Sequence, residues 1–361
     1  MTHPHIARGP IMADVAGFSL TAEEKQRLCN PNVGGVILFR RNFATVAQLT
    51  ALTAEIHALR TPALVIAVDH EGGRVQRFID GFTRLPAMDV LGRLWDEQGA
   101  EAAKHTATTV GWVLATELRA CGIDLSFTPV LDLGWGNNQV IGNRSFHADA
   151  EVVTELALAL QTGLNQGGMR SCGKHFPGHG FVEGDSHHVL PEDLRGYAEL
   201  MAQDMVPFQR LSQAGMAAVM PAHVVYPEVC AKPAGFSKTW LQDILRRDLG
   251  FNGVIFSDDL TMEGAVSEGN ISQRAQVSFV AGCDIVLVCN RPDLVDELLL
   301  DFDAPQNDYL AERWAYMAGQ GVPADFAATM ATAEFASAQA LVAALATPQD
   351  VAGGVKVGEM F

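Results

Sequence analysis

Residues 170–191 read RSCGKHFPGHGFVEGDSHHVLP. The first six residues predict a short strand, and the remainder, interrupted by glycine and proline, predicts a long loop that leaves the strand's carboxyl end. Four histidines, Lys174 and Asp185 gather in this segment. Such a concentration of ionisable groups at the end of a strand is typical of the loops that carry chemistry on α/β scaffolds.

The strand at the start of this segment is one of eight short apolar runs that recur along the chain. They span residues 11–17, 35–39, 64–69, 125–133, 170–175, 217–223, 254–258 and 284–290. Apolar residues at helical spacing predict helices between them, at residues 21–28, 45–59, 101–120, 151–166, 194–213, 238–247 and 271–281.

Strands this apolar are buried on both faces, which favours a parallel sheet. Eight strand–helix units predict an α/β fold of the (β/α)8 TIM-barrel type. A doubly wound open sheet is the alternative, but no GxGxxG follows the first strand. We expect residues 1–345 to form a single barrel domain in which residues 293–345 are extra packing helices. Residues 346–361 are expected to form a loose C-terminal tail.

Composition narrows the class of protein. The chain has 361 residues, a hydrophobic fraction of 48% and a formal net charge of −17. This charge argues against nucleic acid or an anionic membrane as the main partner. The six cysteines form no CxxC pair, which predicts free thiols rather than a disulfide framework or a zinc site. With no secretory signal and no apolar run of about 18 residues, we expect a cytoplasmic protein.

Polar residues follow nearly all of the later predicted strands, and in a parallel barrel their carboxyl ends converge on one mouth. Any one of these residues could be a helix cap or a surface partner, but their number favours a shared pocket. They are Asp69, Arg77, Asp132, Arg144, Lys174, His175, His223, Asp258, Asp259 and Asn290.

Several long motifs resemble those of family 3 glycoside hydrolases. They are KHFPGHG (174–180), DSH (185–187), FSDDLTMEGA (256–265), VDHEGGRVQR (68–77) and IGNRSFH (141–147). The likeness extends from residue 8 to about residue 290. Within that family, the chain resembles the cytoplasmic β-N-acetylhexosaminidases of peptidoglycan recycling. The resemblance implies a retaining enzyme that releases non-reducing terminal N-acetylglucosamine from peptidoglycan fragments, with or without peptide.

The resemblance also implies roles for individual residues. Asp258 matches the catalytic nucleophile, His187 the general acid/base, and Asp185 the aspartate that orients and tunes this histidine. The residues that match those holding the sugar are Asp69, Arg77, Arg144, Lys174 and His175. His223, Met262 and Asp259 lie near that site by their position in the sequence.

Elementary chemistry agrees with these roles. A retaining glycosidase needs a carboxylate that attacks the anomeric carbon and a second group that protonates the leaving oxygen. An imidazole with a pKa near ~6.5 can act as acid and then as base. Asp185 can fix the tautomer of His187 through the other ring nitrogen.

Three alternatives stay open. His175, His223 and Asp258 superficially resemble the ligands of a metal-dependent amidohydrolase, although no HxH ends the first strand. Asp258 and Asp259 could instead assist an acetamido group that acts as internal nucleophile. A sugar-binding protein without catalysis is the third. We expect no cofactor and no metal, a small sugar or muropeptide as substrate, no nucleic acid or membrane as partner, and a monomer.

Overall fold

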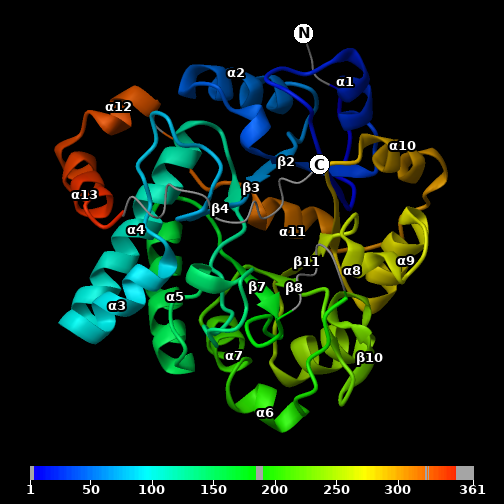
Figure 1. The fold of residues 1–361 in the computed structure, drawn as a ribbon. Coiled ribbons are helices and arrows are strands. Elements are labelled where there is room, and N and C mark those ends of the chain that lie inside the picture. The colour runs from blue at the N-terminus through cyan, green and yellow to red at the C-terminus, as the bar shows by residue number, and fades with distance from the viewer. Residues whose placement is uncertain (1–3, 184–189, 322, 324, 347–361) are drawn as a thin grey trace.

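The computed structural model describes residues 4–183, 190–321, 323 and 325–346. Eight parallel strands form a nearly closed barrel, which confirms the predicted (β/α)8 fold (Figure 1). In spatial order they are β6 (Leu125–Ser126), β3 (Val65–Val68), β2 (Val33–Leu38), β1 (Ile11–Asp14), β12 (Ile285–Val288), β11 (Val254–Asp259), β8 (Ala218–Pro221) and β7 (Cys172–Phe176).

The two end strands of this order meet through the chain that follows β6. Parallel bridges join Leu125 to Arg170 and Val130 to Lys174. The main-chain N–H of Cys172 also donates to the carbonyl of Thr128 at 2.8 Å. The strand that was predicted at residues 125–133 is therefore regular only at its start, and its remainder closes the barrel by irregular pairing.

Successive side chains of a strand point to opposite faces of the sheet. Because one face packs inside the barrel and the other packs against helices, residues on both faces are apolar. In β3, Val65 and Ala67 belong to the cluster that fills the barrel, together with Phe127 and Phe256. Ile66 of the same strand belongs to the outer cluster that packs against the helices. Both faces are thus buried, as the sequence pattern predicts for a parallel sheet.

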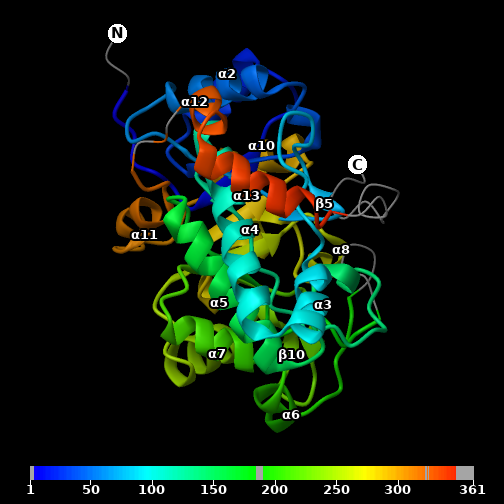
Figure 2. The same ribbon diagram turned by 90° about the vertical axis from the view of Figure 1, so that its left-hand side faces the viewer.

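Helices surround the strands (Figure 2). They are α1 (Ala22–Leu28), α2 (Val46–His57), α3 (Met88–Gln98), α4 (Ala100–Ala120), α5 (Ala150–Gln166), α6 (Tyr197–Ala202), α7 (Val206–Gln213), the π-helix η4 (Thr239–Asp248), α8 (Glu263–Val266), α9 (Ile271–Ala281), α10 (Pro292–Asp301), α11 (Leu310–Met317), α12 (Phe326–Met330) and α13 (Ala333–Ala343).

Short elements complete the loops. Two antiparallel hairpins follow barrel strands: β4 (His70–Gly72) with β5 (Val75–Gln76), and β9 (Val225–Tyr226) with β10 (Cys230–Pro233). In the described part of the chain, single-turn 3-10 helices lie at η1 (Arg40–Asn42), η2 (Gly142–Arg144) and η3 (Ala234–Phe236).

The prediction of one helix over residues 194–213 is wrong. The carboxylate of Asp193 accepts hydrogen bonds from the main-chain N–H of Arg195 at 3.0 Å and from its guanidinium, and Asp193 N donates to Val225 O. These bonds hold the chain before Tyr197 as a loop. Helix α6 then ends where the backbone of Gln203 leaves the helical region, and α7 begins at Val206. Helix α3 and the two hairpins were not predicted.

Helices after residue 293 pack against the barrel and its helices. Trp314 of α11 is fully buried beneath the strands, where its indole N–H donates to Gly9 O at 2.8 Å. Phe335 of α13 packs on Trp112 of α4, with ring centroids 5.7 Å apart. Residues 347–361 of the predicted tail lie outside the described residues, and no helix that the structure describes is long and apolar enough to cross a membrane.

Candidate active site

A buried network of charges occupies the carboxyl ends of β3 and β7. Lys174 Nζ lies 2.7 Å from Asp69 Oδ1 and 2.6 Å from Glu71 Oε1. Arg144 makes a bidentate pair with Glu71, both bonds 2.8 Å long. Arg77 approaches the second oxygen of Asp69 at 3.8 Å. Four of the five residues predicted to hold the sugar, Asp69, Arg77, Arg144 and Lys174, are thus brought together.

Glu71 is the centre of this network, and its charge state follows from its neighbours. Burial alone would raise the pKa of Glu71, but Arg144 and Lys174 together lower it well below the ordinary value. Burial would lower the pKa of Lys174, and Asp69 and Glu71 reverse this and raise it. All three side chains therefore stay ionised at neutral pH.

The fifth predicted binding residue, His175, is oriented by Asp132. Its Nδ1 lies 2.7 Å from Asp132 Oδ2, and its main-chain N–H lies 3.2 Å from both oxygens of the same carboxylate. Asp132 also accepts from the main-chain N–H of His179 at 2.7 Å. Burial alone would raise the pKa of Asp132, but the two histidines lower it. An ionised Asp132 accepts a hydrogen bond from Nδ1–H and so fixes the tautomer of His175.

Asp258 lies next to the end of β11, at the same mouth. Its Oδ1 accepts a hydrogen bond of 2.8 Å from the main-chain N–H of Asp259. His223, at the end of β8, lies with Nε2 3.1 Å from the carbonyl oxygen of Asp259. Met262 is 8% exposed, and its main-chain N–H donates to the same carbonyl at 3.2 Å. Of the three residues that were placed near the site by position, Asp259 contacts Asp258, and His223 and Met262 contact the main chain of Asp259.

The predicted acid/base pair, Asp185 and His187, lies outside the described residues. Two residues without a predicted role occupy central places instead. Glu71 was read only as part of a strand-end motif, and Asp132 only as a strand end. Their signal in the sequence was weak, because a lone carboxylate at such a position is as often a helix cap as part of a site.

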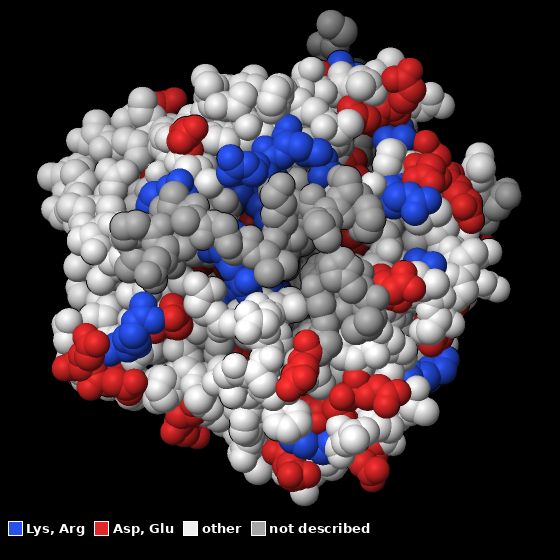
Figure 3. All heavy atoms as spheres, viewed as in Figure 1, with Lys and Arg blue, Asp and Glu red and all other residues white. Residues whose placement is uncertain are grey.

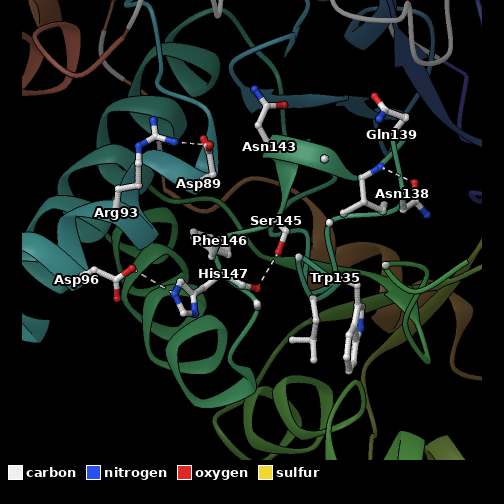
Figure 4. A pocket seen from close by; sticks show the side chains of 17 residues that line it. Asp89, Arg93, Asp96, Trp135, Asn138, Gln139, Asn143, Ser145, Phe146 and His147 are labelled. Atoms are coloured by element: carbon white, nitrogen blue, oxygen red, sulfur yellow. Dashed lines mark hydrogen bonds and ion pairs between the residues drawn. The ribbon is translucent and has the colours of Figure 1, made fainter. Parts of the chain in front are cut away.

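A pocket of about 330 Å³ adjoins this region. It lies between α3 and residues 133–148, and Figure 4 shows Arg93 and Asp96 on one wall and Trp135 on another. Asn143 and Ser145 line this pocket, whereas Arg144 between them is bonded to Glu71. The loop that supplies Arg144 thus separates the pocket from the charge network.

Basic side chains gather along one side of the mouth, over the ends of β2 and β3, although the chain is acidic (Figure 3). At the end of β2, Arg41 pairs with Asp14 and donates to Asn290 Oδ1 at 2.8 Å. Arg40 beside it is exposed. An anionic group that enters the mouth here meets at least one accessible guanidinium.

The amidohydrolase alternative finds no support in this geometry. His175 is bonded to Asp132, and His223 faces a main-chain carbonyl. Within residues 4–183, 190–321, 323 and 325–346, no three histidine, cysteine or acidic side chains group as metal ligands. All six cysteines, each of which lies in this part of the chain, are free thiols, as predicted.

Comparison with known proteins supplies the family. A model of the glycosyl hydrolase family 3 N-terminal domain matches residues 11–304. The chain belongs to glycosyl hydrolase family 3. It is 71% identical to a β-hexosaminidase of Neisseria meningitidis serogroup A, and the match covers 100% of both chains.

Solved structures of family 3 agree with this relationship. NagZ from Neisseria gonorrhoeae in complex with N-trifluoroacetyl-D-glucosamine is 67% identical, with a TM-score of 0.92 over 95% of this chain and 100% of the other. A family 3 β-N-acetylglucosaminidase from Paenibacillus is 32% identical, with a TM-score of 0.78 over 91% of this chain and 66% of the other. The chain is accordingly a glycoside hydrolase of the β-N-acetylhexosaminidase type.

Proposed function

We propose that this family 3 enzyme releases non-reducing terminal N-acetylglucosamine from peptidoglycan fragments, and that it serves peptidoglycan recycling. The fragment is N-acetylglucosaminyl-1,6-anhydro-N-acetylmuramic acid, with or without peptide. The observation that carries the proposal is the arrangement at the mouth, where Asp258, at the carboxyl end of β11, lies at the same end of the barrel as the network of Lys174, Asp69 and Arg144. The N-acylated glucosamine named for the 67% identical NagZ complex supports the same sugar.

The first chemical step forms a covalent glycosyl-enzyme. A carboxylate oxygen of Asp258 attacks the anomeric carbon, while the bond to the leaving oxygen breaks and His187 donates its proton to that oxygen. The hydrogen bond from Asp259 N holds Asp258 Oδ1 in place.

The second step returns the enzyme to its starting state. His187, now a base, takes a proton from water, and the resulting hydroxide equivalent displaces Asp258 from the anomeric carbon. Asp185 orients and tunes His187 for both steps. Two inversions at the same carbon retain the β configuration.

The sugar itself is held by the charge network. Asp69, at 24% side-chain exposure, is the acceptor most open to the mouth, and Lys174 and Arg77 flank it as donors. His175, with its Nδ1 bonded to Asp132, presents the other ring nitrogen. Such fixed donors and acceptors match the hydroxyls of a pyranose.

A substrate-assisted mechanism needs a carboxylate that orients the acetamido group, and the sequence offered Asp258 and Asp259 for it; Asp259 is the one without a role in the covalent route. Its Oδ1 accepts from the main-chain N–H groups of Thr261 and Cys289, and its Oδ2 contacts Thr261 Oγ1 at 2.9 Å. This carboxyl is therefore engaged by the protein rather than by the substrate, which favours the covalent route.

A chromogenic assay tests the activity. Release of 4-nitrophenol from 4-nitrophenyl N-acetyl-β-D-glucosaminide is expected from the wild type and not from Asp258→Ala. Retention of rate after exhaustive chelation is expected as well. Absence of 4-nitrophenol release from a folded wild type would leave only the sugar-binding alternative.

Covalent trapping tests the mechanism. A fluorinated N-acetylglucosaminyl fluoride is expected to inactivate the enzyme and to label the peptide that contains Asp258, as mass spectrometry of a digest would show. Hydrolysis without any adduct would favour the substrate-assisted route. Release of N-acetylglucosamine from purified anhydro-muropeptides, compared with chitobiose, tests the aglycone.

A further inference from the structure

Asp259 is a partly buried carboxyl beside the proposed nucleophile, and the covalent mechanism gives it no step. Its Oδ1 accepts from Thr261 N at 3.0 Å and from Cys289 N at 3.2 Å. Cys289 follows β12, so this carboxyl ties the end of β11 to the neighbouring strand. The main chain of Asp259 holds Asp258 Oδ1 and contacts His223. Movement of Asp259 would therefore move the nucleophile.

The two contacts of the Thr261 hydroxyl indicate which protonation state of Asp259 fits this geometry. Thr261 Oγ1 lies 2.9 Å from Asp259 Oδ2 and 3.1 Å from the carbonyl oxygen of Cys289. A hydroxyl has one proton to donate. If Asp259 is ionised, that proton can reach only one of these two acceptors. If Asp259 is neutral, its own O–H donates to Thr261 Oγ1, and Thr261 donates to Cys289 O, so that every group is satisfied.

We propose that Asp259 is a positioning residue that works as a neutral carboxylic acid, linked through Thr261 to Cys289, and that this link fixes Asp258 for attack. The inference rests on the proposed covalent mechanism. Burial and, to a smaller extent, the adjacent Asp258 raise the pKa of Asp259 against the hydrogen bonds from Thr261 and Cys289, to about 7, in agreement with the geometry. A neutral Asp259 leaves Asp258 as the single anion at the end of β11.

Charged groups on the neighbouring elements complete the environment of Asp259. The neighbour on β11 is Asp258, and the neighbour at the end of β8 is His223. Beyond β12 lies the thiol of Cys289, whose pKa is raised by burial and by Asp259. Arg274 of α9 donates to Leu260 O at 2.8 Å. At the end of β1, Asp14 is paired with Arg41. Loss of the proton from Asp259 thus places a negative charge next to the negative charge of Asp258.

The test measures the rate of inactivation by a fluorinated N-acetylglucosaminyl fluoride as a function of pH. Fluoride leaves without a proton from a general acid, so this rate reports the nucleophile and not His187. For the wild type we expect the inactivation rate constant to fall about tenfold between pH 6.5 and 8.5, as Asp259 ionises. Asp259→Asn keeps the Oδ1 acceptor and donates from Nδ2 to Thr261, so its profile is expected to be flat.

Two further variants separate positioning from folding. Asp259→Ala is expected to lower the inactivation rate constant by at least about tenfold at pH 6.5, with the inhibition constant changed less than about threefold. Thr261→Val, which keeps the fold's shape and removes only the hydroxyl, is expected to lower it by about three- to tenfold. Asp243→Asn, an exposed change on η4, serves as the control with the wild-type profile.

A wild-type profile that stays flat, or a fall with pH that persists in Asp259→Asn, would overturn the inference while the covalent mechanism stands. Equal inactivation rates for Thr261→Val and the wild type would overturn it as well. If the wild type forms no adduct at any pH, the proposed covalent mechanism fails and this inference fails with it.

Discussion

Replacement of Glu71 by glutamine tests the charge network directly. The Glu71 carboxylate is 2% exposed and pairs with Arg144 and Lys174, whose side chains are 5% and 3% exposed. Glutamine keeps the volume but offers one oxygen and no charge to two buried cations. Removal of one partner from a buried ion pair typically costs about 3–5 kcal/mol. Because Asp69 still pairs with Lys174 at 2.7 Å, we expect the lower end, about 3 kcal/mol.

Urea unfolding measures this loss. With a slope of about 3 kcal/mol per M, the midpoint of Glu71→Gln should fall by about 1 M. The pKa of Glu71 is lower in the folded than in the unfolded chain. Its contribution is therefore fully present above the unfolded pKa of about 4.3 and is lost as pH falls through the folded pKa. The difference between wild type and variant should stay constant from about pH 8 to pH 5 and shrink only in more acidic solution.

Activity should fall with stability, because Glu71 fixes the two cations proposed to hold the sugar. A displacement of about 1 Å in such groups can cost about 100-fold, so we expect kcat/KM to fall by about that factor. Asp243→Asn makes the same acid-to-amide change in an exposed pair with Arg247 and should alter neither quantity. A Glu71→Gln enzyme with the control's midpoint and more than a third of wild-type kcat/KM would refute the reasoning.

Three further predictions concern other carboxyls and the mouth. Asp132→Asn should free the His175 ring, which Asp132 holds at 2.7 Å, and lower kcat/KM by about 10- to 100-fold; steady-state kinetics with the 4-nitrophenyl substrate would contradict this if the constant changes less than about threefold. Burial raises the pKa of Glu117 to about 7, so wild-type stability should decline as pH rises from about 4.5 to 7. In Glu117→Gln that slope should be smaller than in the wild type, and only the Glu117 contribution should be lost, because Asp259, whose pKa is also raised to about 7, still contributes. Urea midpoints of both proteins at about pH 5 and 8 check the difference. Arg40→Gln should raise KM about three- to tenfold for a carboxylate-bearing muropeptide in low salt but not for the neutral chromogenic substrate; equal effects on both substrates would contradict a role in aglycone binding.

The barrel could be predicted from the sequence because burial on both faces leaves a plain signal in each strand. In β3, four consecutive apolar residues satisfy the barrel interior and the helix layer at once. The errors arose where side-chain hydrogen bonds override local periodicity. The helix predicted over residues 194–213 starts late, because Asp193 bonds to Arg195 and Val225. It is interrupted after Ala202, where Asp204 pairs with Arg195. Periodicity does not record these contacts.

The site was predictable to the extent that strand ends identify it. Lys174, Asp69 and Arg144 stand at the ends of strands or in long motifs, and the structure brings them together. Glu71 could not be distinguished from its neighbours, because its role depends on two cations that are 73 and 103 residues away in sequence. The roles of Asp258 and His187 stay predictions that the trapping experiment tests.

The mouth holds carboxyl groups in different protonation and pairing states, as Glu71, Asp259 and Asp258 show. Glu71 is ionised because two cations outweigh its burial. Asp259 has a pKa of about 7 because burial is opposed only by hydrogen bonds from Thr261 and Cys289, and Asp258 adds to the rise. Different environments thus give chemically similar carboxyl groups different pKa values and different roles. Arg144 and Lys174 neutralise the charge of Glu71, and the neutral Asp259 adds no charge. At the end of β11 this leaves the carboxylate of Asp258 to attack the anomeric carbon.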